Sequence, residues 1–220
     1  MNKLISIDDA IAKLEDGMTI MIGGFLGCGN PHRIIDAIVE KGSKDLTLIC
    51  NDSGFPEIGV GKLIVNKQIK KLIASHVGTN PETGKQMNSG EMEVVLVPQG
   101  TLAEQVRAKG AGLGGILTPT GVGTVVEEGK KKVEIEGVTY LLELPISADI
   151  AFIAGDTVDK YGNIIYYGAT SNFNNLMATA ADLVIVEAET IAEVGELDPH
   201  HVDTAGIFVD YIVDGGAING

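Results

Sequence analysis

Short runs of mostly apolar residues recur along the chain, and turn-forming residues bound each of them. Runs of four or five residues that do not alternate with polar positions are typical of strands buried on both faces. Between them, apolar positions at helical spacing indicate covering helices. We predict strands over residues 18–22, 46–50, 72–75, 94–97, 150–154 and 183–186, and helices over residues 7–15, 31–41, 102–109 and 172–180.

This alternation predicts an α/β fold with a mostly parallel sheet and helices on both of its faces. No low-complexity linker and no repeat of fixed period interrupts the 220 residues, so we expect one domain spanning residues 1–220. Residues 132–143 depart from the pattern because their alternation predicts a β-hairpin that turns at Glu136-Gly137. Residues 164–167 suggest a further short or edge strand.

Capping residues define several of the predicted helix ends. Ser6 to Asp9 and Thr101 to Glu104 resemble capping boxes, which assigns Glu104 to a cap rather than to catalysis. Asn30 is predicted to cap the helix that begins at Pro31, and Gly42 to end it.

Residues 110–124 are dense in glycine and are predicted to form a loop. Long loops in compact domains are often functional, so this one is interpreted either as a mobile lid over a site or as an irregular connector.

The charge balance excludes several classes of function. The chain has 30 acidic against 16 basic residues, a net charge of −14, which argues against nucleic acid and anionic membranes as partners. Two acids, Asp8 and Asp9, interrupt any apolar core of a signal peptide. The longest apolar stretch, residues 18–29, is shorter than the roughly 20 residues that span a bilayer. A cytoplasmic protein is therefore expected.

Neither cysteine belongs to a metal or disulfide pattern. Cys28 and Cys50 are the only two, they do not form a C-x-x-C pair, and no ligand cluster accompanies them. We expect reduced thiols and no metal site. A nucleophilic role for Cys28 would need a nearby base, for which only His32 is available in sequence; His200-His201 is interpreted as a surface pair.

A glycine-rich loop lies where the first predicted buried strand passes into a helix. It comprises Gly23, Gly24, Phe25, Leu26, Gly27, Cys28 and Gly29. Free amides and a helix N-terminus at such a junction suit phosphate, carboxylate or a developing oxyanion. The glycine order matches neither the dinucleotide fingerprint nor the P-loop, so a plain structural turn remains an alternative.

Polar clusters also follow the next three predicted strands directly. They are Asn51–Ser53, Ser75–Asn80 and Gln99–Thr101. Because ligands bind beyond the carboxyl ends of parallel strands, we expect these clusters and the glycine loop to share one rim of the sheet.

Taken together, these segments resemble the family I coenzyme A transferases, and most closely the alpha subunit of the acetoacetate/butyrate–acetate type. The resemblance covers most of the chain, with the motifs in the family's order. The matching segments are Asp16-Gly17 with Gly23-Gly24-Phe25 and Gly29-x-Pro31, Asn51-Asp52, Ser75 to Gly84, Pro98 to Glu104, and Thr118 to Thr124.

The resemblance implies acyl transfer through an enzyme-bound glutamyl-CoA thioester. In the family the glutamate belongs to a Ser-Glu-Asn-Gly motif, which is absent here; Ser89-Gly90-Glu91-Met92 lacks the required order. The resemblance therefore implies that a beta subunit carries the nucleophile, in an alpha2beta2 assembly, and that this chain has no catalytic residue. Coenzyme A would be a substrate rather than a tightly bound cofactor, and acetate, butyrate or acetoacetate the acids.

The resemblance also assigns binding roles, each with an alternative from the residues themselves. Residues 23–29 would bind coenzyme A, with Phe25 covering the pantetheine arm or packing in the core. Asn51 and Asp52 would shape the acyl pocket or cap a turn. His76 and Gln99 complete the predicted pocket, although a histidine here is also compatible with a structural role.

Two other functions fit a glycine loop on such a sheet. A sugar-phosphate isomerase would hold its substrate's phosphate there, but no Lys or Arg occurs in the rim clusters to pair with it. A non-catalytic ligand sensor is the other alternative, although no DNA-binding segment accompanies the domain.

Overall fold

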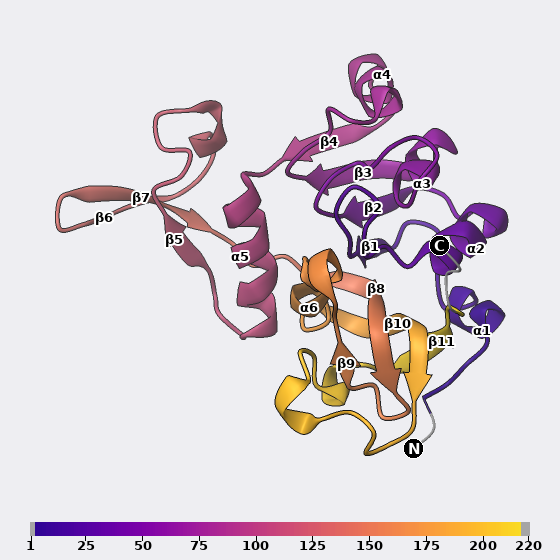
Figure 1. Cartoon of the computed structure of the whole chain (residues 1–220). Coiled ribbons are helices and arrows are strands. Elements are labelled where there is room, and N and C mark those ends of the chain that lie inside the picture. Colours follow the sequence, from indigo (N-terminus) through magenta and orange to yellow (C-terminus); the bar gives the residue numbers. More distant parts are fainter. Residues whose placement is uncertain (1–2, 217–220) are drawn as a thin grey trace.

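An eight-stranded sheet forms the body of the computed structural model, which describes residues 3–216 (Figure 1). Seven strands run parallel in the order β11-β10-β8-β1-β2-β3-β4, and β9 pairs antiparallel with β8. The strands are β1 Thr19–Ile22, β2 Leu46–Ile49, β3 Ile69–Ala74, β4 Glu93–Leu96, β8 Ala148–Asp159, β9 Ile164–Ile165, β10 Ala181–Ala192 and β11 Tyr211–Asp214. The predicted parallel sheet is confirmed; the ends of the predicted domain, residues 1–2 and 217–220, lie outside the described residues.

Helices cover both faces of this sheet, as predicted. One apolar cluster joins the sheet to α1, α2 and α3, and a second joins its other face to α5 and α6. The helices are α1 Ile7–Ile11, α2 His32–Lys41, α3 Gly61–Val65, α4 Pro81–Ser89, α5 Gln99–Gly110 and α6 Asn174–Met177, with short 3-10 helices η1 Val125–Glu127, η2 Gly168–Ser171, η3 Pro199–His201 and η4 Gly206–Phe208.

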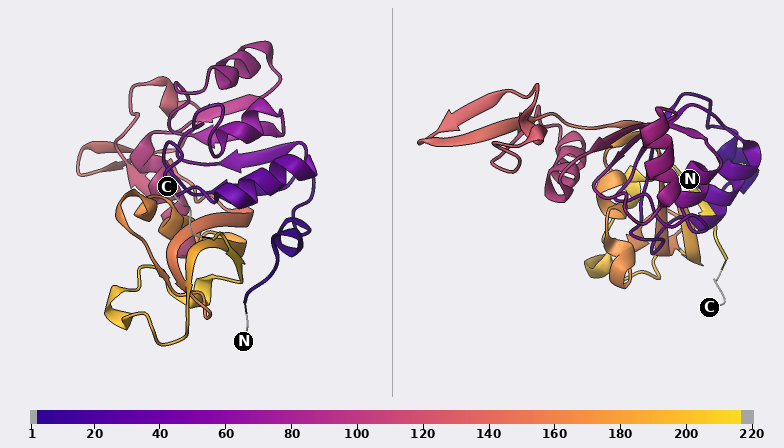
Figure 2. Two further views of the ribbon diagram at one scale, coloured as in Figure 1. Left: turned by 45° about the vertical axis from the view of Figure 1, so that its right-hand side comes forward. Right: turned by 90° about the horizontal axis from the view of Figure 1, so that it is seen from above.

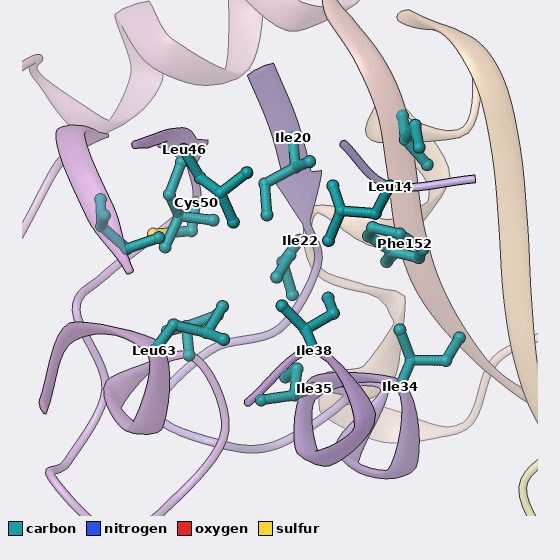
Figure 3. Close-up of a cluster of buried hydrophobic side chains, with 14 of the residues drawn as sticks. Leu14, Ile20, Ile22, Ile34, Ile35, Ile38, Leu46, Cys50, Leu63 and Phe152 are labelled. Carbon is teal, nitrogen blue, oxygen red and sulfur yellow. The ribbon is translucent and has the colours of Figure 1, made fainter. Parts of the chain in front are cut away.

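The central strand β1 shows why its sequence is continuously apolar. Ile20 and Ile22 point into the first cluster, toward Ile34 and Ile38 of α2, whereas Met21 belongs to the second cluster (Figure 3). All of these side chains are fully buried. Successive strand residues face opposite sides, so a strand covered on both faces needs apolar residues at every position.

Some predicted helix ends are wrong for identifiable reasons. Helix α1 ends at Ile11 rather than at residue 15, because the amides of Lys13 and Leu14 bond three residues back instead of four. The Lys41 ammonium also donates to the Ile11 carbonyl (2.8 Å) and to the Leu14 carbonyl beyond the helix. The cap at Ser6 is confirmed, since its hydroxyl accepts from the Asp9 amide. Helix α6 is confined to four residues of the predicted 172–180.

The second predicted capping box is not a cap. Helix α5 begins earlier, at Gln99, with Pro98 preceding it, so Thr101 lies buried inside the helix. Glu104 instead pairs with Arg107 on the exposed helix surface at 2.6 Å.

Besides the short 3-10 helices, four elements were not predicted: α3, α4, β5 and β11. Helix α4 carries a recognisable signal, because Asn80 caps it, Pro81 opens it and Gly90 ends it in the left-handed conformation. Strand β11 follows the short 3-10 helix η4 rather than a longer amphipathic helix that would mark it.

A second, three-stranded antiparallel sheet projects from the body (Figure 2, right). It contains β5 Ile116–Thr118, β6 Lys132–Ile135 and β7 Val138–Glu143, in the order β5-β7-β6. The predicted hairpin is confirmed, with Glu136 and Gly137 at φ of 51° and 78° in its two-residue turn. The predicted loop over 110–124 is partly wrong, because β5 lies within it and pairs with β7.

Candidate functional site

The glycine loop between β1 and α2 folds into a tight turn. Phe25 and Cys28 exchange both backbone hydrogen bonds, each at 2.9 Å. Leu26 and Gly27 between them have φ of 49° and 90°, the positive pair that a two-residue type I′ turn requires. The second of these positions also has no room for a side chain, because a Cβ on Gly27 would lie 2.6 Å from Ile58 Cγ2.

Most amides of the loop are already bonded within the protein. Gly23 donates to the Phe152 carbonyl, Gly24 to Asn172 Oδ1 and Leu26 to Asp52 Oδ2. Among the described residues, the amides of Gly27, Gly29 and Asn30 have no hydrogen-bond partner. The cradle of free amides that the sequence predicts is thus reduced to these three donors.

The N-terminus of α2 is capped differently from the prediction. Helix α2 begins at His32, and the Asn30 side chain turns back to donate to the Gly23 carbonyl instead of capping. The carboxylate of Glu187, in the middle of β10, accepts from the Arg33 amide (3.2 Å) and the Ile34 amide (2.8 Å). A protein carboxylate therefore occupies the position that the helix dipole offers to an anion.

Burial dominates the electrostatics of Glu187. Its side chain is 7% exposed, and this desolvation raises the pKa of its carboxyl above the usual value of 4.5. The amides of Ile34 and Arg33 act in the opposite direction but do not outweigh burial. Between the unfolded and the folded pKa, the folded state holds more protons, so stability falls as pH rises through that interval.

We expect Glu187→Gln to remove this pH dependence. Above about pH 4.5, the free energy of unfolding of the wild type should fall relative to that of the variant as pH rises, because only the wild type must ionise a buried group. Urea unfolding of both proteins across this range measures the difference. A difference that stays constant with pH would contradict the assignment.

The predicted rim is continuous in the structure. Asp52, which is 3% exposed, accepts from Leu26 and Asn51 through Oδ2 at 3.0 Å and from Gly54 through Oδ1 at 2.8 Å. Asn51 in turn accepts from the Gln99 amide and, through its carbonyl, from the Ser75 hydroxyl. The ends of β2 and β3 and the start of α5 are thereby tied to the glycine loop.

The cavity beside the loop is lined by three residues of the predicted coenzyme A loop, Gly27, Cys28 and Gly29, but by none of the predicted pocket residues. It has a volume of about 240 Å³ and lies between residues 27–30, the middle of β8 and of β10, and residues 215–216 that follow β11. Its polar lining includes Asp156, Glu187, Glu189 and His32. Of the residues predicted to form a pocket, none lines this cavity: Asn51 and Asp52 are buried beneath the rim, and His76 and Gln99 are exposed along it.

Part of this lining had a signal in the sequence. Asp156 and Glu187 follow the apolar runs 150–154 and 183–186, just as the predicted clusters follow the earlier strands. Asn172 and Asn174, which bond the loop at Gly24 and Gly29, had none, because they reach it from a segment about 145 positions away.

The remaining candidates divide by exposure. Phe25 is 48% exposed and does not pack in the core. Cys28 is an exposed free thiol, whereas burial raises the pKa of Cys50, whose Sγ donates to the Asp52 carbonyl. His200 and His201 are exposed, as predicted. Among residues 3–216, no three His, Cys, Asp or Glu side chains are placed to hold a metal ion.

Comparison with known proteins identifies the class. The family model described as Coenzyme A transferase matches residues 4–215. The chain is 56% identical over 211 residues to the acetate CoA-transferase subunit alpha of Escherichia coli K12, covering 96% of each. It is 53% identical to the acetoacetyl-CoA:acetate/butyrate CoA transferase alpha subunit of Clostridium acetobutylicum, covering 96% of this chain and 97% of that one.

Solved structures share the fold. An acyl-CoA transferase from E. coli O157:H7, solved as a thioester complex with CoA, superposes with a TM-score of 0.83 at 23% identity over 97% of this chain and 47% of its own. Glutaconate coenzyme A-transferase from Acidaminococcus fermentans gives 0.83 at 23% identity over 96% of this chain and 75% of its own.

The chain belongs to the coenzyme A transferase family. Its relatives at more than half identity are alpha subunits of such enzymes, which confirms the class that the ordered motifs predicted.

Proposed function

We propose that this chain is the alpha subunit of an enzyme that moves coenzyme A between a short-chain acyl-CoA and a free acid, with acetate, butyrate and acetoacetate as the acids. The names and the 56% and 53% identities of the two relatives support this substrate class. The observation that carries the binding role is the set of three free amides, which belong to the cavity-lining residues Gly27, Gly29 and Asn30.

In the proposed reaction, a glutamate carboxylate of a beta subunit attacks the thioester carbonyl, and the coenzyme A thiolate leaves as an acyl anhydride forms. The thiolate then attacks the glutamyl carbonyl of the anhydride, which gives glutamyl-CoA and releases the first acid. The second acid reverses both steps. Each addition places negative charge on a carbonyl oxygen, and free backbone amides stabilise such charge by roughly 3 kcal/mol per donor.

The charges around the cavity favour one part of the substrate over another. Asp156 and Glu189 line the cavity, and carboxylates repel phosphate, so the diphosphate is expected outside it. The pantetheine arm is uncharged, and its amide N–H groups can donate hydrogen bonds to these carboxylates. Phe25, Phe55 and Ile58, all more than a third exposed, provide apolar surface beside the loop for the same arm.

The proposal predicts that the chain alone does not turn over. Purified alone, it should give no exchange of coenzyme A between acetyl-CoA and butyrate, because its sequence lacks the Ser-Glu-Asn-Gly nucleophile motif. Co-expression with a partner chain that carries this motif should restore exchange, measured by the appearance of butyryl-CoA. A matched partner with that glutamate changed to glutamine is the control and should stay inactive. Full activity of the isolated chain would overturn the proposal.

The assembly, cofactor requirement and location of this enzyme are inferred together with its proposed activity. We infer an alpha2beta2 assembly, coenzyme A as substrate without a tightly bound cofactor, and a cytoplasmic location. Two free thiols support a reducing compartment. No helix among the described residues is long and apolar enough to cross a bilayer.

A further inference from the structure

The side chain of Asn174 joins three walls of the cavity but does not line it. This side chain is fully buried. Its Nδ2 donates to the carbonyls of Gly29 and Thr170, each at 2.9 Å, and its Oδ1 accepts from the Ala154 amide at 3.1 Å. These three partners line the cavity and come from the glycine loop, from η2 and from β8. One side chain therefore fixes how the three walls lie relative to one another.

Two glycines of the loop leave room for this side chain. A Cβ on Gly23 would lie 1.7 Å from Asn174 Oδ1, and a Cβ on Gly29 would lie 3.2 Å from its Nδ2. The first distance is far below the roughly 3.5–4 Å that separates nonbonded atoms, so no side chain fits at Gly23 while Asn174 stays in place. The close approach of Asn174 thus contributes to the need for glycine at both ends of the loop.

The bond to the Gly29 carbonyl also sets the direction of the next amide. In a planar trans peptide the carbonyl and the N–H point in opposite directions. The Gly29 carbonyl points to Asn174, so the Asn30 N–H, which belongs to the same peptide group, points away from Asn174. This N–H is one of the three loop amides that have no hydrogen-bond partner among the described residues.

Asn172 acts in the same way on the preceding peptide. Its Nδ2 donates to the Cys28 carbonyl at 3.4 Å, and this carbonyl also accepts from the Phe25 amide at 2.9 Å. Because the Cys28 carbonyl faces Asn172, the Gly29 N–H faces away from it. Gly29 itself has φ of 69°. Two successive N–H groups that turn away from one segment at such a residue form a concave site for an anionic oxygen.

On the basis of the function proposed above, we propose that Asn174 is a positioning residue for coenzyme A transfer and that Asn172 assists it. Through the two carbonyls that they hold, these side chains direct the N–H groups of Gly29 and Asn30 toward the thioester oxygen that gains negative charge. Asn174 is fully buried and does not touch the substrate, so it acts only through the backbone.

Exchange by the assembled enzyme with Asn174→Asp is the first measurement. Aspartate has the same size and keeps an acceptor for the Ala154 amide, but the Gly29 carbonyl loses its donor, so the following N–H should turn. We expect kcat to fall at least about 30-fold and the KM for acetyl-CoA to stay within about threefold, as for an interaction made mainly in the transition state. Asn172→Asp should lose less, because the Cys28 carbonyl keeps its other donor.

Asn163→Asp is the matched control. Asn163 Nδ2 donates to Asp159 Oδ2 and its Oδ1 accepts from the Gly206 amide, each at 2.8 Å, so the same substitution again places an oxygen against an acceptor. None of these three residues lines the cavity, so kcat should stay within about twofold of the wild type. Equal kcat values for Asn174→Asp and Asn163→Asp, or a loss confined to KM, would overturn the proposal.

Circular dichroism and urea unfolding establish that both variants are folded under the conditions of the assay. If Asn174→Asp does not fold, Asn174→Ser takes its place, because serine removes the added carboxylate and still lacks the paired donors of the amide. The same split between kcat and KM is expected for it.

Acetate binding to the full chain without its partner gives a second measurement that does not depend on turnover. We expect titration with acetate to shift the N–H resonances of Gly29 and Asn30 in nitrogen–proton NMR spectra of the wild type, and not in those of Asn174→Asp. A wild-type assembly without any exchange would refute the proposed function, and this titration would still decide the role of Asn174. Acetate that shifts neither resonance in the wild type, or both equally in the variant, would overturn that role.

Discussion

Alanine at Gly24 is expected to destabilise the chain by about 3–5 kcal/mol and to lower exchange by the assembled enzyme at least about 100-fold. Gly24 has φ of 121°, which residues with a side chain rarely adopt. A Cβ there would also lie 1.8 Å from Asn30 Nδ2, and Asn30 is buried and cannot move aside freely. The variant must therefore displace the residue that holds the loop against the start of α2.

Gly17→Ala is the matched control for this variant. Gly17 also has a positive φ, of 80°, but nothing lies within 4 Å of the Cβ that alanine would add. It should cost about 1–2 kcal/mol of backbone strain and leave exchange near the wild-type rate. Urea unfolding and the coenzyme A exchange assay measure both effects. Equal losses for the two variants would show that the close contact with Asn30 has no importance.

Asp52→Ala is expected to have the second-largest effect, roughly 3 kcal/mol or more of stability. It removes the acceptor for the amides of Leu26 and Gly54 and for the Asn51 side chain. Each buried donor left without a partner costs about 1–3 kcal/mol. Because Leu26 sits at the tip of the glycine turn with a positive φ, we also expect exchange to fall when its anchor is removed.

Asp36→Ala separates loss of this acceptor from loss of a negative charge. Asp36 forms an ion pair with Lys62 on the surface, where such pairs contribute at most about 1 kcal/mol. Its removal should hardly change the urea midpoint or the rate of exchange. If Asp52→Ala proved as mild as Asp36→Ala, the hydrogen bonds at Asp52 would not hold the loop.

The strands were readable from sequence because burial on both faces requires an uninterrupted apolar run, as at Ile20 to Ile22. Helix ends were less readable, because partners distant in sequence bond there: Lys41 donates to the last carbonyl of α1, and Glu187 accepts from two amides in the first turn of α2. Strand β5 could not be predicted because it lies in a glycine-rich segment with low strand propensity. Its pairing with β7 stabilises the strand conformation instead.

The candidate site could be predicted only in part, again because some of its contacts come from segments distant in sequence. The rule that ligands bind at strand ends brought Asn51, Asp52 and Gln99 to the rim correctly, because it depends only on topology. It could not tell that Asn51 and Asp52 face inward to hold the turn. Nor could local pattern reveal Asn174, whose side chain bridges Gly29 and Ala154 from a distant segment.

Strand β1 lies in the middle of the sheet, between β2, which follows it closely, and β8, which begins at Ala148. During synthesis, the first four strands can pair with one another while one side of β1 stays bare. The Gly23 amide gains its partner only when Phe152 has arrived, and the Gly24 amide only when Asn172 has. The first two residues of the glycine loop therefore stay without these partners until the last third of the nascent polypeptide has been made, and a ribosome that stalls in the projecting hairpin leaves an open sheet edge exposed to neighbouring chains.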